Sequence, residues 1–138
     1  MAGDEDISIR AVIEYERKRG RKAVDARQSH RGTGIDVVSD RIINIQVKSN
    51  LESPSTFWLS LTDFERLQAD TNYRIYYVHD LHRRPKVIEL DPDTVRSLIY
   101  PELKFVVSPD AEMWRRIFQN AKLRGLYDEI DFANQAKI

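Results

Sequence analysis

The chain of 138 residues contains no cysteine. This absence excludes a disulfide framework, a thiolate metal site and a cysteine nucleophile, and it fits a reducing compartment. No apolar run approaches the length of a membrane span, and the acidic start at Asp4, Glu5 and Asp6 is unlike a signal peptide. We therefore expect a cytoplasmic protein with no membrane partner.

Two further absences narrow the class of function. The chain has neither a Gly-x-Gly-x-x-Gly fingerprint nor a P-loop, which disfavours nucleotide binding by either route. The 22 basic and 22 acidic residues cancel, which argues against a protein that coats nucleic acid. Charge is nevertheless uneven, because residues 17–31 carry seven basic side chains against Asp25 alone. This segment is compatible with a phosphate-binding face and equally with a solvated helix end and turn.

The order of predicted elements indicates an α/β fold with a central mixed β-sheet flanked by helices. No repeat or linker divides the chain, so we expect one domain over residues 1–138, with a core at about 6–125 and a frayed C-terminal tail. The predicted elements are a helix over 6–19, a short strand over 22–28, a loop over 30–34, a hairpin of strands 35–39 and 41–48, a strand over 56–61, a short helix to Ala69, strands over 73–78 and 86–90, and two final helices.

Capping signals predict where the helices begin. Asp6 or Ser8 is expected to cap the first helix, and Thr62 with Glu65 reads as a capping box. Asp91-Pro92 and Ser108-Pro109 each combine a cap with a proline at the first helical position. The last helix has an apolar side that we interpret as core rather than as a base-stacking surface: Met113, Trp114, Ile117, Phe118 and Ala121.

An aspartate beside one strand and a polar pair on the next form the clearest candidate site. Gln46 and Lys48 lie two residues apart, so they project from the same side of the sheet, and Asp36 belongs to the preceding strand. A carboxylate, an amide oxygen and an ammonium at one place are the parts of a metal-dependent phosphodiesterase site. The alternative is that Gln46 and Lys48 form the wet face of a half-exposed hairpin and that Asp36 is a turn residue.

Basic residues flank this candidate site. Lys22, Arg27 and Arg31 are the candidates for contact with phosphate. His30, in the loop before Asp36, is a candidate for phosphate contact or proton transfer. His79 and His82 fall in a predicted turn, where we expect solvated side chains rather than metal ligands.

Several motifs in this order resemble a known family. The chain is similar to the PD-(D/E)XK nuclease superfamily and, more closely, to the domain found beside helicases and at the C-terminus of the plant protein NO VEIN. The resemblance covers roughly residues 8–95 and rests on Tyr15-Glu16-Arg17 with Gly20-Arg21, Gly34-Ile35-Asp36-Val37, Ile45-Gln46-Val47-Lys48, Leu61-Thr62-Asp63-Phe64-Glu65, Tyr73–Val78 and Asp91-Pro92.

The resemblance implies a restriction-endonuclease-like fold that hydrolyses phosphodiester bonds in DNA with Mg²⁺ or Mn²⁺. Asp36 would be the central metal ligand, with Gln46 and the backbone carbonyl of Val47 as further ligands. Lys48 would orient the attacking water or stabilise charge in the transition state, and Glu16 would assist from the first helix. The implied partners are a helicase or a restriction, defence or repair system, and the superfamily includes homodimers.

Gln46 is the departure from the superfamily pattern, which usually has a second acid there. An amide brings no charge, so metal affinity should fall unless Glu14 or Glu16 compensates. Mrr-like restriction endonucleases are similar to this chain in carrying Gln-x-Lys at the same place. Two expectations therefore stay open: an active nuclease, or a weakened nuclease fold that binds nucleic acid or a protein.

Overall fold

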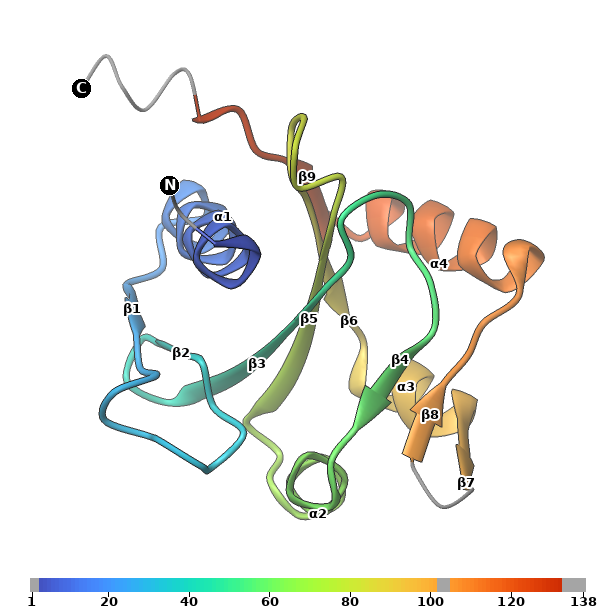
Figure 1. The fold of residues 1–138 in the computed structure, drawn as a ribbon, viewed down its shortest axis with the longest axis horizontal. Coiled ribbons are helices and arrows are strands. Elements are labelled where there is room, and N and C mark those ends of the chain that lie inside the picture. The colour runs from blue at the N-terminus through green and yellow to red at the C-terminus, as the bar shows by residue number, and fades with distance from the viewer. Residues whose placement is uncertain (1–2, 102–104, 133–138) are drawn as a thin grey trace.

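The computed structural model describes residues 3–101 and 105–132. Within them a mixed sheet of six strands has the order β1-β2-β3-β5-β6-β9, and only the β3–β5 pair is parallel (Figure 1). The strands of this sheet are β1 Ala23–Asp25, β2 Val37–Ser39, β3 Ile43–Ser49, β5 Tyr73–His79, β6 Lys86–Leu90 and β9 Tyr127–Glu129. The predicted α/β fold with a central mixed sheet is confirmed.

Different helices cover the two faces of this sheet (Figure 1). The helices in the described residues are α1 Asp4–Lys18, α2 Leu61–Ala69, α3 Pro92–Leu98 and α4 Ala111–Leu123. Helix α1 packs Tyr15 against the face that carries Ile45 and Tyr76. The other three helices cover the face that carries Ile75 and Tyr77. Successive side chains of a strand point to opposite faces, so β5 contributes to both cores.

Three short strands form a second sheet outside the central one. Its order is β4-β8-β7, with β4 Phe57–Leu59, β7 Ile99–Pro101 and β8 Phe105–Val107. The strand predicted over 56–61 is therefore present, but it pairs with β8 rather than with the central sheet. Helix α2 begins two residues after β4, so this small sheet helps to place the start of α2.

The helix starts confirm one predicted cap and correct another. Asp91 caps α3, and its side chain accepts a hydrogen bond from the Thr94 N–H, as predicted. The capping box predicted at Thr62 is wrong, because α2 begins at Leu61 and its cap lies two residues earlier, at Ser60. Ser60 and Asp63 form the box instead, each side chain accepting from the backbone N–H of the other.

The caps predicted for the first and last helices are also wrong. Helix α1 begins at Asp4 after Gly3, so the predicted caps Asp6 and Ser8 lie inside the helix. Asp110, not Ser108, caps α4. The apolar side of α4 is core as predicted at Trp114 and Ala121, with Ile117 and Phe118 packed against that core, whereas Met113 is exposed.

The central sheet continues beyond residue 125, where the sequence placed the end of the core. Strand β9 pairs with β6, and Ile130 is fully buried. Residues 133–138 of the predicted frayed tail lie outside the described residues. No described helix is both long and apolar enough to cross a membrane.

One expectation about histidine is corrected. His79 is the last residue of β5 and is buried, rather than solvated in a turn. His82 is exposed, as expected. The strand extends one residue further than predicted because His79 pairs with Lys86 of β6, and the His79 ring packs against Tyr77 and Phe118.

Candidate metal and nucleic-acid site

Most of the predicted site residues gather around an open cavity of about 570 Å³. Its wall combines the loop before β2, the middle of β3 and the beginning of α2. The charged and polar side chains of the wall that carry its chemistry are Glu5, Arg27, His30, Arg31, Asp36, Gln46, Lys48 and Asp63. The structure therefore brings together Asp36, Gln46 and Lys48 with three of the four residues predicted to contact phosphate.

Asp36 is held at the cavity by the backbone of β3. Its Oδ2 accepts a hydrogen bond from the Val47 N–H at 2.9 Å. Burial raises the pKa of the Asp36 carboxyl, and the negative charges of Glu5 and Asp63 raise it further, whereas the Val47 amide and Lys48 lower it. Ionised Asp36 therefore carries a free-energy cost that a nearby cation would relieve.

Gln46 and Lys48 point to the same face of the sheet, as their spacing predicts. In the parallel pairing with β5, Gln46 lies beside Ile75 and Lys48 beside Tyr77. The Gln46 Oε1 atom is buried and accepts no hydrogen bond from the described residues. A buried acceptor without a partner costs free energy, so a donor or a cation that contacted this oxygen would stabilise the protein.

Asp63 is the partner of Lys48, and it is not among the residues that the sequence predicts for the site. Its Oδ2 accepts a hydrogen bond from Lys48 Nζ at 3.1 Å, and the Asp63 residue is only 3% exposed. With the capping box predicted at Thr62 and Glu65, Asp63 was expected to be an ordinary residue inside the helix. The spacing from Ser60 to Asp63, a cap followed by an acid three residues later, is the signal that would have found it.

Glu16 lies away from the cavity, contrary to the expectation that it assists there. Helix α1 covers the opposite face of the sheet, and the Glu16 carboxylate accepts hydrogen bonds from Arg21 Nε at 2.9 Å and from the Tyr76 hydroxyl at 3.0 Å. The acid that α1 contributes to the cavity wall is Glu5, in its first turn. At 1.5 Å per residue, Glu5 and Glu16 lie roughly 16 Å apart along the helix.

Arg27 lines the cavity, but acids surround its guanidinium. It lies 2.7 Å from Asp25 Oδ2, 2.8 Å from Asp6 Oδ1 and 3.5 Å from Glu5 Oε1. These contacts tie the end of β1 to the first turn of α1. Arg27 therefore holds Glu5 at the cavity edge, and its charge is largely balanced before any phosphate arrives.

The other predicted phosphate contacts differ in position. Arg31 is exposed at the cavity and donates a hydrogen bond to Gln28 Oε1 at 2.8 Å, with no carboxylate partner among the described residues. His30 also lines the cavity, with Nδ1 3.0 Å from Ser29 Oγ. Lys22 is not part of the wall, because it precedes β1 and therefore lies at the other end of that strand.

The oxygen ligands for a cation are few. Among the described residues, no three His, Asp or Glu side chains converge as a metal-binding group. The cavity offers the Asp36 carboxylate and the Gln46 amide oxygen. Val47 does not line the cavity, but its C=O points to the same side of β3 as its N–H, which donates to Asp36. Mg²⁺ commonly keeps several waters and needs only one or two carboxylates, so this set fits a weakly held Mg²⁺ or Mn²⁺.

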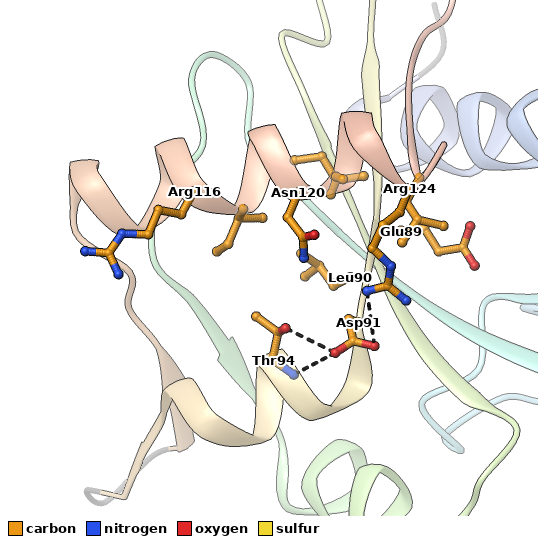
Figure 2. A pocket seen from close by; sticks show the side chains of 11 residues that line it. Glu89, Leu90, Asp91, Thr94, Arg116, Asn120 and Arg124 are labelled. Carbon is orange, nitrogen blue, oxygen red and sulfur yellow. Dashed lines mark hydrogen bonds and ion pairs between the residues drawn. The ribbon is translucent and has the colours of Figure 1, made fainter.

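A second pocket lies between α3 and α4 (Figure 2). It has a volume of about 180 Å³ and contains none of the residues predicted for the site. Arg124 reaches from α4 toward Asp91, with 3.7 Å between Arg124 Nη1 and Asp91 Oδ1. The same aspartate accepts from Thr94, so the polar groups at this pocket already serve the start of α3.

The chain was compared with protein families, curated proteins and solved structures. A family model described as the C-terminal domain of protein NO VEIN matches residues 4–90. The matched residues run from the beginning of α1 to the end of β6 and include the whole cavity wall. No curated protein and no solved structure matches the chain.

Proposed function

The chain belongs to the family of the NO VEIN C-terminal domain, and from this premise we propose that it is a metal-dependent nuclease of the PD-(D/E)XK type. In this proposal the fold is restriction-endonuclease-like, the substrate is DNA and the cofactor is Mg²⁺ or Mn²⁺. The proposal deepens the family assignment, which by itself names no activity.

The observation that carries the proposal is that two groups with unfavourable surroundings line one cavity. One is an amide oxygen without a hydrogen bond, and the other is a carboxylate whose ionisation is disfavoured. Gln46 Oε1 is buried without a hydrogen-bond partner in the described residues, and the pKa of Asp36 is raised by burial and by neighbouring acids. Both line the same wall. A divalent cation would satisfy the two groups together, whereas a wet hairpin face would leave neither of them buried.

Each residue then has a role that its position supports. Asp36, Gln46 and the Val47 carbonyl would hold the cation, which would supply Lewis acidity toward the phosphate oxygens. Lys48 presents its ammonium on the same face, where it would stabilise charge that develops in the transition state. Arg31 and His30 would hold the strand through its phosphates, which position nucleic acid without reading its sequence.

A second candidate function is a binding module without catalysis, and the ion pairs of the cavity favour it. Lys48 is paired with Asp63, and Arg27 is surrounded by three acids. The cavity charges are thus mostly balanced within the protein, and Gln46 adds none. In this alternative the cavity would hold nucleic acid or a protein partner through Arg31 and its neighbours.

The proposed setting is the one that the family resemblance implies. The domain would act beside a helicase or within a restriction, defence or repair system. Cutting both strands of a duplex would call for a homodimer. We place this activity in the cytoplasm.

A cleavage assay tests the proposal. Purified protein is incubated with supercoiled plasmid, linear duplex and single-stranded DNA in Mg²⁺ or Mn²⁺, beside Asp36→Ala, Lys48→Ala and the matched surface control Lys122→Ala. We expect metal-dependent cleavage that falls roughly a hundredfold in Lys48→Ala and at least as far in Asp36→Ala, but not in the control. Cleavage that survives both cavity substitutions would refute the site, and binding without cleavage would favour the second candidate.

A further inference from the structure

The Asp63 carboxylate contacts three different elements around the cavity. It lies at the third position of α2, where Oδ2 accepts from both the Ser60 N–H and Lys48 Nζ, each at 3.1 Å. Its other oxygen, Oδ1, faces the Tyr73 hydroxyl at 3.3 Å. Helix α2, strand β3 and strand β5 thus meet at one buried side chain. A buried carboxylate is tolerated only with such a set of partners.

Tyr73 extends this junction to the loop that ends at Asp36. Its hydroxyl lies 3.1 Å from the Gly34 carbonyl oxygen as well as 3.3 Å from Asp63, so one proton is shared between two acceptors. Burial and the charge of Asp63 raise the pKa of the Tyr73 phenol, which keeps that proton in place. Asp63 is therefore connected to the backbone two residues before Asp36.

Gly34 packs directly against Asp63. A Cβ atom at this position would lie 2.6 Å from Asp63 Oδ1, and Gly34 has a φ of +73°. Glycine alone combines this backbone conformation with so close an approach. The loop that carries Asp36 and the helix that carries Asp63 are thus in direct contact.

We propose that Asp63 is the positioning residue of this cavity, which fixes both the Lys48 ammonium and the loop that ends at Asp36. A helix cap would need only the Ser60 contact, whereas Lys48, Tyr73 and Gly34 belong to other parts of the fold. The consequence for catalysis rests on the proposed nuclease function. The positioning itself does not, so it is measured without any cleavage.

Three variants separate the contacts. Asp63→Asn removes the charge that faces Lys48 but keeps a side chain suited to a helix start. Tyr73→Phe removes the link to Gly34 and leaves the Lys48 contact intact. Ser60→Ala removes the other half of the capping box and touches neither. For each variant, the acylation rate of Lys48 by an amine-reactive reagent is followed by mass spectrometry, and amide hydrogen exchange is followed over residues 33–36 and over α2.

We expect Lys48 to react roughly tenfold faster in Asp63→Asn, the change expected when a charge-assisted hydrogen bond is lost. Tyr73→Phe should speed exchange over residues 33–36 and leave Lys48 unchanged. Ser60→Ala should speed exchange in α2 alone. The proposal is overturned if Asp63→Asn leaves the Lys48 rate unchanged, or if Ser60→Ala raises that rate as much, because Asp63 would then be a cap only.

The cleavage assay tests separately whether Asp63 matters for catalysis. If the wild type cleaves DNA, Asp63→Asn should lower kcat with KM little changed, because a misplaced Lys48 weakens the transition state more than substrate binding. If the wild type does not cleave, the acylation and exchange results still decide the role of Asp63. Failure of the nuclease proposal and failure of the positioning proposal are thus distinguishable.

Discussion

Ionisation of Asp36 carries a free-energy cost in this cavity. Its carboxyl is half-buried near Glu5 and Asp63, and burial is the largest cause of its raised pKa. A group whose pKa is higher in the folded than in the unfolded protein destabilises the fold once it ionises. Sites that hold cations commonly carry such a cost in the absence of their ligand.

Asp36→Asn should therefore raise the melting temperature at neutral pH without divalent metal. The amide keeps an acceptor for the Val47 N–H and removes the half-buried charge. The advantage should be full above the folded pKa of Asp36 and vanish in acid, where the carboxyl is protonated in both states. Thermal unfolding at about pH 7 and about pH 3 measures this difference. A lower melting temperature for the variant at neutral pH would contradict the raised pKa.

Gly34→Ala should destabilise the protein more than Gly32→Ala. Both glycines have positive φ, which costs a substituted residue about 1 kcal/mol. At Gly32 nothing lies within 4 Å of the new Cβ, whereas at Gly34 the Asp63 carboxylate must move. We expect a total loss of about 2–3 kcal/mol at Gly34. Urea unfolding of the two variants measures the difference. Equal losses of unfolding free energy would mean that the Asp63 side chain moves away from the new Cβ at no free-energy cost.

The sequence could predict only part of the cavity at the level of residues. Gln46 and Lys48 were identifiable because the period of a strand fixes which side chains share a face. Glu5 and Asp63 come from two helices far apart in the chain, and no local pattern reports that both meet Asp36. Glu16 was selected for its place beside Tyr15 and Arg17, whereas the packing of α1 decides which of its acids reaches the cavity.

At the level of elements, α1 is fixed to the sheet by a buried ionic cluster at its C-terminal end. The Glu16 carboxylate binds Arg21 and Tyr76 and is 1% exposed, and Tyr15 donates to Glu89 Oε2 at 3.0 Å. The cluster lies on the face opposite the cavity residues of β3. It anchors α1, whose other end carries Glu5.

Glu16→Gln should lower stability by about 2 kcal/mol, because it leaves the partly buried Arg21 guanidinium with only the Glu89 carboxylate, at 3.4 Å. The matched control is Glu112→Gln, whose exposed pairs with Arg115 and Arg116 should cost at most about 0.5 kcal/mol. Chemical unfolding measures both variants. If Glu16→Gln instead lost metal binding without losing stability, Glu16 would be part of the metal site and its assignment to the ionic cluster alone would be wrong.

The helices and strands differ in how far the local sequence alone predicts them. Strands β5 and β6 were predictable from runs of β-branched and aromatic residues. Strands β7, β8 and β9 were not, because strands of three residues depend on their neighbours for stability, and the pairing of the predicted strand β4 with β8 was not predictable either. At α2, both Ser60 with Asp63 and Thr62 with Glu65 satisfy the capping pattern, and only the tertiary structure chooses between them.

At the scale of the whole molecule, the sheet separates two cores, and His79 is buried in the one beneath α4. The ring is 4% exposed, packs against Phe118 and forms no hydrogen bond with the described residues, although Nδ1 lies 3.5 Å from Asp80. Burial lowers the pKa of His79 to about 4, and the positive charge of Lys86 also lowers it, whereas Asp80 raises it. The folded protein therefore favours neutral His79.

Acid should destabilise the whole fold through this residue. A histidine with a lowered folded pKa contributes its full stability above its usual value of 6.5, and this contribution is lost as pH falls toward about 4. The loss amounts to roughly 3 kcal/mol. His79→Phe should flatten the stability profile over this range, and the exposed control His82→Phe should not. An unchanged profile in His79→Phe would mean that His79 does not titrate as proposed.

The fold class followed from the order of elements, whereas the strand order did not. Placing β5 beside β3 requires a parallel crossover through β4 and α2, which no local pattern encodes. This crossover positions α2 on the face of Gln46 and Lys48 and so completes the cavity with Asp63. The site is a property of the topology as much as of its motifs.

The role of Gln46 as a cation ligand is tested most directly by calorimetric titration of Mn²⁺ into the wild type and Gln46→Glu, with the exposed Gln119→Glu as the matched control. If the Gln46 oxygen contacts the cation, adding a charge there should tighten binding by about tenfold or more, because affinity follows the charge of the ligands. The control should bind as the wild type does. If Gln46→Glu binds Mn²⁺ no more tightly than Gln119→Glu, the cavity is not a metal site.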